Sequence, residues 1–119
     1  MNKLIKIQQA TIENNRVQLL TNESITGLIP REHILVDSDN ISFIYLMEEN
    51  DHYVYIGLDE SAWPALRESM NKKLPAYLIS DNDQIELTSF QEEIEYIINN
   101  IKGNGNYGEE MVEKVEKTF

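Results

Sequence analysis

The chain has 119 residues, 41% of them hydrophobic, and its twenty-one acidic and ten basic residues give a formal net charge of −11. This length suits one folded domain, and no stretch is basic enough to follow the phosphates of a nucleic acid or of an anionic membrane. The absence of cysteine excludes disulfides, thiolate zinc sites and cysteine nucleophiles.

Domain organisation and location are predicted from features that the chain lacks. Neither an internal repeat nor a Pro/Gly/Ser-rich linker interrupts it, so we expect a single domain over residues 1–119. No apolar run approaches the roughly 20 residues needed to span a bilayer, and the N-terminal segment has no signal-peptide pattern. We therefore expect a cytoplasmic protein that binds neither nucleic acid nor membrane.

The first half of the chain is predicted to form strands. Its segments are rich in β-branched and aromatic residues and are separated by short runs of turn-forming residues. A short strand is expected at 33–36, followed by a turn at 37–40. Two hairpins are expected as well: residues 3–13 with 16–21 around Asn14–Asn15, and residues 41–47 with 52–58 around a turn at 48–51.

The second half is predicted to be mainly helical. A helix over 61–73 has Ser61 as its expected N-cap, and a third short hairpin is expected over 75–87. The clearest element is a helix over 88–102, which has an expected capping box formed by Thr88 with Gln91 or by Ser89 with Glu92. Its apolar residues recur at i, i+4, i+7, i+8 and i+11, which predicts one buried stripe: Phe90, Ile94, Ile97, Ile98 and Ile101.

The segment GNGNYG at 103–108 matches the dinucleotide-binding pattern G-x-G-x-x-G. In a dinucleotide-binding fold this pattern follows a strand and opens the helix of a βαβ unit. Here it follows the best predicted helix, and only eleven residues remain after Gly108. We therefore interpret it as a joint between two helices, with Gly103 in the left-handed conformation that ends the first. No nucleotide cofactor is expected.

Other candidate sites are weak. The acidic loops at 37–40 and 80–86 lack the glycine at the sixth position of a calcium loop and have isoleucine at the fifth, where an oxygen ligand belongs, so turns with Asx hydrogen bonds explain them better. His33 and His52 have no partner at metal-ligand spacing, and no nucleophile or phosphate-binding motif is present. The sequence therefore predicts no metal site, no cofactor and no catalytic residue.

Tyr53 and Tyr55 are the candidate binding residues. In a strand they project from one face of the sheet, while Val54 projects from the other. Two tyrosines on an exposed face would make a contact surface, whereas a strand packed beneath a helix would explain them equally well.

Three stretches of the sequence are distinctive: ILVDSDNISFIY at 34–45, the Trp63 helix, and the run from Glu86 to Glu116 that contains NIKGNGNYG. They resemble the YjbL-like family of small acidic proteins of Bacillus, Staphylococcus and their relatives. The resemblance covers most of the chain from about Ile34 onward. It implies a cytosolic Gram-positive protein without an assigned activity, cofactor or site residue.

We predict an α+β fold in which a mostly antiparallel sheet of hairpins packs against about three helices, the last two joined by the Gly/Asn-rich loop. The residues favour a small non-enzymatic interaction or regulatory module that binds another protein, and a homodimer is compatible with them. The alternative is an enzyme or small-molecule binder with a pocket between sheet and helices, lined by Tyr53, Tyr55, His52 or Arg31.

Overall fold

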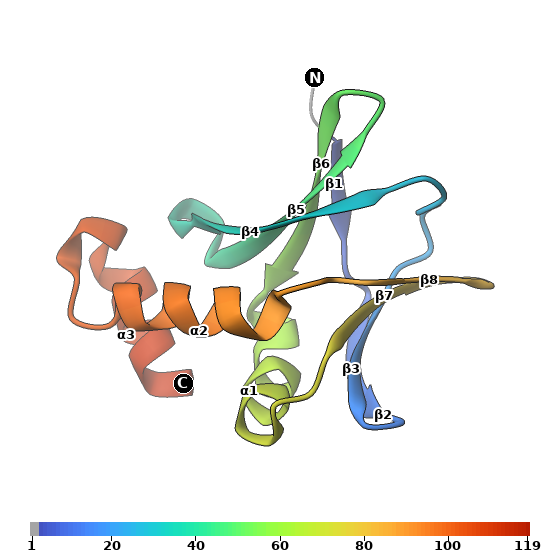
Figure 1. Ribbon diagram of the computed structural model, residues 1–119. Helices are drawn as coiled ribbons and strands as arrows, with labels where there is room; N and C mark the ends of the chain where they lie inside the picture. The colour runs from blue at the N-terminus through green and yellow to red at the C-terminus, as the bar shows by residue number, and fades with distance from the viewer. Residues whose placement is uncertain (1–2) are drawn as a thin grey trace.

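A computed structural model describes residues 3–119. The fold is α+β with three α-helices, as the sequence predicts, but the strands form two four-stranded sheets instead of one (Figure 1). Sheet I has the strand order β1-β6-β5-β4, and sheet II has the order β2-β3-β7-β8. Figure 1 shows α2 running beneath β4, with sheet II to the right, α3 to the left and α1 below.

The bounds of the elements in the described part of the chain are as follows. The strands are β1 (Lys3–Lys6), β2 (Gln9–Glu13), β3 (Arg16–Leu20), β4 (Ile29–Asp37), β5 (Ser42–Glu49), β6 (His52–Asp59), β7 (Ala76–Ser80) and β8 (Asp83–Glu86). The helices are α1 (Trp63–Lys72), α2 (Phe90–Ile101) and α3 (Glu109–Thr118), with short 3₁₀ turns at Ser38–Asn40, Glu60–Ala62 and Gly105–Tyr107.

The strand expected over residues 3–13 is divided between the two sheets. Its first part, β1, pairs in parallel with β6, with Lys3 opposite Val54. Its second part, β2, forms the expected antiparallel hairpin with β3. A second parallel pair joins β3 to β7, so each sheet is mixed, while the four other pairings are antiparallel. The parallel pairs bring together segments that are far apart in sequence.

The turns of the first two hairpins are confirmed. Asn14 and Asn15 have φ of 55° and 59°, and Asn50 and Asp51 have φ of 48° and 66°. Two successive residues with positive φ are typical of the type I′ turn, whose twist matches that of the flanking strands. Asparagine and aspartate adopt this conformation more readily than other non-glycine residues.

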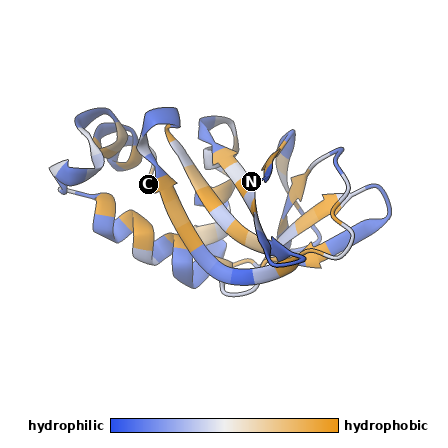
Figure 2. Cartoon of the chain, turned by 90° about the horizontal axis from the view of Figure 1, so that it is seen from above, coloured by the Kyte–Doolittle hydropathy of each residue, from blue (hydrophilic) through white to orange (hydrophobic). Residues whose placement is uncertain are grey.

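One hydrophobic core runs between the inner faces of the strands and the helices. In Figure 2 orange runs along the strands, while the peripheral turns are blue. The predicted stripe of α2 belongs to this core, because all five of its apolar residues are buried. Trp63 is also buried, and its ring stacks on Phe43 with the centroids 5.1 Å apart.

The expected helix caps are wrong in detail. The N-cap of α1 is Ala62, and Ser61 instead lies in the preceding 3₁₀ turn, where its N–H donates to Asp59. The N-cap of α2 is Ser89, but its hydroxyl makes no cap bond and donates to Glu32 Oε2 at 2.6 Å. Gln91 Nε2 donates to Ser69 Oγ and to the carbonyl of Leu74, at 2.9 and 2.6 Å. Tertiary partners have replaced the expected capping box.

The joint between α2 and α3 has the predicted form. Gly103 follows the C-cap Lys102 and has φ of 73°, and its N–H donates to Glu116 Oε2 at 2.8 Å. A short 3₁₀ turn follows, with Asn104 as its cap, and α3 then begins with Glu109 at its first turn. The positive end of the α3 dipole favours this carboxylate.

Replacing Gly103 by alanine is expected to lower the free energy of unfolding by about 1 kcal/mol. No heavy atom lies within 4 Å of the position that a Cβ would take, so the loss comes from the positive φ alone. Gly105 is a matched control, because it also has open space around it and its φ lies outside the left-handed range. Chemical denaturation measures both variants, and an equal loss for Gly105→Ala would contradict this explanation.

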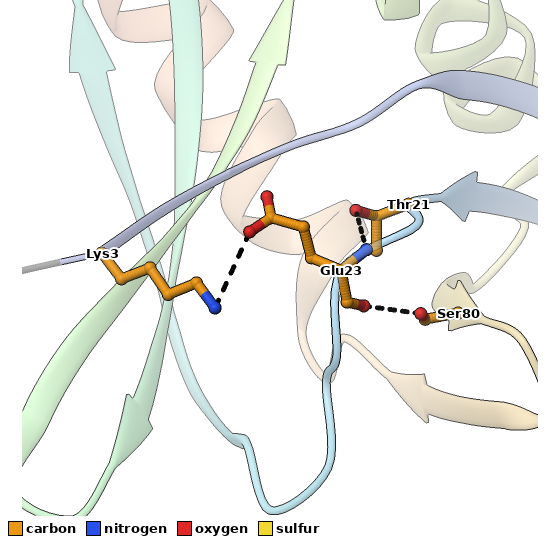
Figure 3. Close-up of polar contacts among 4 residues, drawn as sticks. All are labelled: Lys3, Thr21, Glu23 and Ser80. Atoms are coloured by element: carbon orange, nitrogen blue, oxygen red, sulfur yellow. Dashed lines mark hydrogen bonds and ion pairs between the residues drawn. The ribbon is translucent and has the colours of Figure 1, made fainter.

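The loop after β3 ties the two sheets together (Figure 3). Its Glu23 carboxylate pairs with Lys3 of β1 at 3.7 Å, while the Glu23 carbonyl accepts a hydrogen bond from the buried Ser80 at the end of β7. Thr21 Oγ1 accepts a hydrogen bond from the Glu23 N–H. The exposed ion pair contributes little to stability, so the buried Ser80 bond is the firmer link.

Candidate functional site: the outer face of sheet I

The strands of sheet I separate their side chains between two faces. In β6, Val54, Ile56 and Leu58 are buried, while Tyr53 is exposed and Tyr55 is half-buried on the opposite face. This alternation is the period of two of an extended strand. Both candidate tyrosines therefore lie on one face, which we name the outer face because it is turned away from the hydrophobic core.

The strand register places residues of all four strands in rows across the outer face. Leu4 lies opposite Tyr55, which lies opposite Leu46. The neighbouring rows follow from the same pairings: Tyr53 with Glu48 and Ile29, Lys6 with Gly57, Ile44 and Leu35, and Asp59 with Ser42 and Asp37. Apolar side chains thus occupy the middle of the face, and charged ones occupy its margins.

Large apolar side chains are concentrated on this face. Within residues 3–119 five large hydrophobic side chains are exposed, and four of them lie here: Leu4 (49%), Ile29 (56%), Leu35 (36%) and Tyr53 (45%). The fifth is Tyr96 on α2, at 63%. Single exposed apolar residues are ordinary on a protein surface, whereas a contiguous patch marks an interaction site.

A hollow of about 320 Å³ lies in the outer face. Gly57 leaves it open, because a Cβ at that position would come within 3.2 Å of Leu4 Cδ1. The lining of the hollow combines apolar side chains with the carboxylates of Asp37 and Asp59 and the ammonium group of Lys6. The lining residues are Leu4, Lys6, Asp37, Asn40, Ser42, Ile44, Gly57 and Asp59. Asp37 accepts from the N–H and Nδ2 of Asn40, which confirms the expected Asx turn.

The second acidic loop differs from the first. It is the turn between β7 and β8, where Asp81 has φ of 48°. Asp83 accepts a hydrogen bond from Thr26 Oγ1 at 2.9 Å, so this carboxylate joins two loops. Within residues 3–119 no group of three or more histidine, cysteine, aspartate or glutamate residues is placed to hold a metal ion.

The residues proposed to line a pocket between sheet and helices lie elsewhere. Tyr53 and Tyr55 are on the outer face, and His52 is exposed opposite Glu49 at the start of β6. Arg31 lies where the pairing of β4 shifts register, and its Nε is 3.6 Å from Glu48 Oε1. These residues share one end of sheet I and do not converge on a cavity beneath the helices.

A polar cluster joins β4 to α2, and no sequence pattern indicated it. Glu32 and Ser89 both have positive φ, at 57° and 60°, and are hydrogen-bonded to each other. His33 Nδ1 lies 3.6 Å from Glu93 Oε1 in the same region. The mutual hydrogen bond offsets part of the strain of two non-glycine residues in the left-handed region.

Tyr45 is a buried residue of β5, next to this cluster. Its hydroxyl donates to the Thr88 carbonyl at 2.7 Å. Burial raises the pKa of the Tyr45 phenol above its usual value. The phenol therefore stays protonated at neutral pH and acts as a hydrogen-bond donor that fixes the start of α2.

The fold and this face define a small acidic α+β protein with several exposed apolar side chains on one face of a sheet. The model of the UPF0738 family, described as a family of unknown function, matches residues 5–119. The chain belongs to this family, which confirms the expected membership of an uncharacterised family with members in Bacillus.

The relatives extend over nearly the whole chain. UPF0738 proteins of Bacillus mycoides, Bacillus cereus and Bacillus thuringiensis are 40%, 39% and 38% identical to it. Each match covers 96% of this chain and 97% of the relative. No solved structure matches the chain. Over residues 3–119, no helix has the length and apolar character needed to cross a membrane.

Proposed function

We propose that the protein is a non-enzymatic interaction module that binds another protein through the outer face of sheet I. The observation that carries the proposal is the placement of four of the five exposed large hydrophobic side chains on this one face. Tyr53 and Tyr55 lie within it, and tyrosine is enriched in protein interfaces. Burying such a patch against a partner removes apolar surface from water, which favours association.

The charge of the chain favours a partner with a basic rim. The net charge is −11, and Asp37, Asp59 and Glu48 lie on the margins of the face. A second copy of the chain carries the same charge and would be repelled, although a homodimer stays a competing outcome. Salt separates the two cases. Salt screens the attraction to a basic partner and weakens binding, whereas it screens self-repulsion and strengthens a homodimer.

A paired substitution tests the proposal. Ile29→Ser with Tyr53→Ser removes two exposed apolar side chains that flank Glu48 in one row, and it should change the free energy of unfolding by less than about 1 kcal/mol. Tyr96→Ser is the control, because it removes an even more exposed aromatic side chain from α2. A protein retained from a Bacillus lysate is identified, purified and titrated against each variant.

The expected result is binding by the wild-type chain and by Tyr96→Ser, with at least about tenfold weaker binding by the double variant. Added salt should weaken the complex. Equal affinity of all three chains for the partner would show that the outer face is not the binding site. Concentration-dependent dimerisation that strengthens with salt and is lost in the double variant would show that the outer face binds a second copy of the chain.

We also propose a cytoplasmic location and a narrower relationship to the YjbL-like proteins. The acidic composition of the chain supports the cytoplasmic location, and the strings at 34–45 and 100–108 support the relationship to the YjbL-like proteins. Fractionation of cells that express a tagged chain tests the location, and recovery with the envelope would contradict it.

A further inference from the structure

A groove of about 730 Å³ lies between α1 and α2, away from the outer face of sheet I. Gln91 joins the two sides of the groove through its hydrogen bonds to Ser69 and Leu74. Apolar side chains of Met70, Ile98 and Phe119 line it. Its size lies within the range of about 300 to 1,000 Å³ that is typical of small-molecule sites.

Cationic side chains without partners gather around this groove. Five of the ten lysines and arginines make an ion pair, a hydrogen bond or a ring contact: Lys3, Arg16, Arg31, Lys72 and Lys114. The side chains of the five others make none among residues 3–119, and three of these residues line the groove: Arg67, Lys73 and Lys102. This is unexpected in a chain with twenty-one acidic residues to pair with.

The groove therefore differs in charge from the rest of the molecule. Its lining carries three cations against the two carboxylates of Glu92 and Glu95, a balance of +1 in a chain of −11. Lys73 and Lys102 are C-cap residues, and the negative ends of the helix dipoles favour cations there. Arg67 lies in the middle of α1, so the dipole does not account for its position.

We propose that this groove binds a small anionic amphiphile, a carboxylate or phosphate group joined to an apolar body. The apolar body would lie against Met70, Ile98 and Phe119, and Arg67 and Lys102 would hold the anionic group through charge-assisted hydrogen bonds. The proposal does not depend on the proposed function, because the groove and the outer face of sheet I share no residue.

Trp63 provides a built-in reporter of binding. It is the only tryptophan, and its ring centroid lies 5.5 Å from that of Phe119. A ligand that displaces Phe119 changes the surroundings of Trp63 and hence its fluorescence. Backbone amide shifts of Met70, Ile98 and Lys102 provide a second readout that does not require Phe119 to move.

The test titrates the wild-type chain with octanoate, octyl phosphate and the uncharged octanamide. We expect saturable binding of at least one anion, about fivefold or more tighter than that of octanamide, and the tighter anion identifies the headgroup. Arg67→Gln and Lys102→Gln should each weaken binding by about fivefold to tenfold. Lys117→Gln removes another cation without a partner, outside the groove, and should leave the affinity unchanged.

Three outcomes would overturn the proposal. They are no saturable change with either anion in both readouts, equal affinity for octanamide, and equal weakening by Lys117→Gln and Arg67→Gln. Thermal melts of the variants accompany the titrations to verify that these substitutions of exposed side chains leave the fold intact, as expected.

Discussion

Replacing Ile94 by aspartate is expected to lower the free energy of unfolding by about 4 kcal/mol or more. Ile94 is completely buried in the middle of the α2 stripe. A carboxylate there would lose its hydration without gaining a partner, and the packing of the isoleucine side chain would be lost as well. Because a domain of this size is stable by only about 5 to 15 kcal/mol, much of the variant should be unfolded at 37 °C.

Tyr96→Asp is the control for this prediction. It introduces the same charge into the same helix, but Tyr96 is largely exposed, so the loss should stay below about 1 kcal/mol. Circular dichroism during urea denaturation measures both variants. Similar midpoints for Ile94→Asp and Tyr96→Asp would mean that the α2 stripe faces solvent or a partner and does not form the core.

Trp63→Ala is expected to cost about 3 to 5 kcal/mol of unfolding free energy. The indole is buried and packs against Phe43 and Phe119, with ring centroids 5.1 and 5.5 Å away. Its Nε1 also donates to the Leu58 carbonyl at 3.2 Å. Alanine would leave a cavity where β5, α1 and the end of α3 meet, and it would leave that carbonyl without its donor.

Trp63→Phe separates the packing of the ring from its hydrogen bond. Phenylalanine keeps most of the apolar contact and loses the donor, so we expect a smaller cost of about 1 to 3 kcal/mol. Far-ultraviolet circular dichroism follows the unfolding, because both variants lack the tryptophan that fluorescence would use. A cost below about 1 kcal/mol for Trp63→Ala would show that this aromatic cluster contributes little to the core.

The candidate site was only partly predictable from the sequence. The strand period of two placed Tyr53 and Tyr55 on one face, since alternation is a local property of an extended chain. The sequence could not show that Tyr53 stays exposed, or that Leu4, Ile29 and Leu35 lie exposed on the same face. Those residues come from other strands, and strand pairing is decided by contacts between distant segments. The α1–α2 groove had no sequence signal for the same reason.

Local chemistry by itself determined several elements of this protein. Asn14–Asn15 and Asn50–Asp51 specified their turns because these residues tolerate positive φ. The spacing of five apolar residues specified the buried face of α2, and Gly103 specified its end. In each case the decisive interaction lies within a few residues of the chain, so a short stretch of sequence contains it.

Only the tertiary structure decided which sheet each strand joined and which partners the polar side chains took. Residues 3–13 read as one strand, but pairing of β1 with β6 and of β2 with β3 divides them between two sheets. Ser89 and Gln91 suited a capping box, yet Glu32 and Ser69 compete for them from β4 and α1. Local preferences of about 1 kcal/mol are smaller than the free energy gained by burying whole strand and helix faces, so long-range packing prevails.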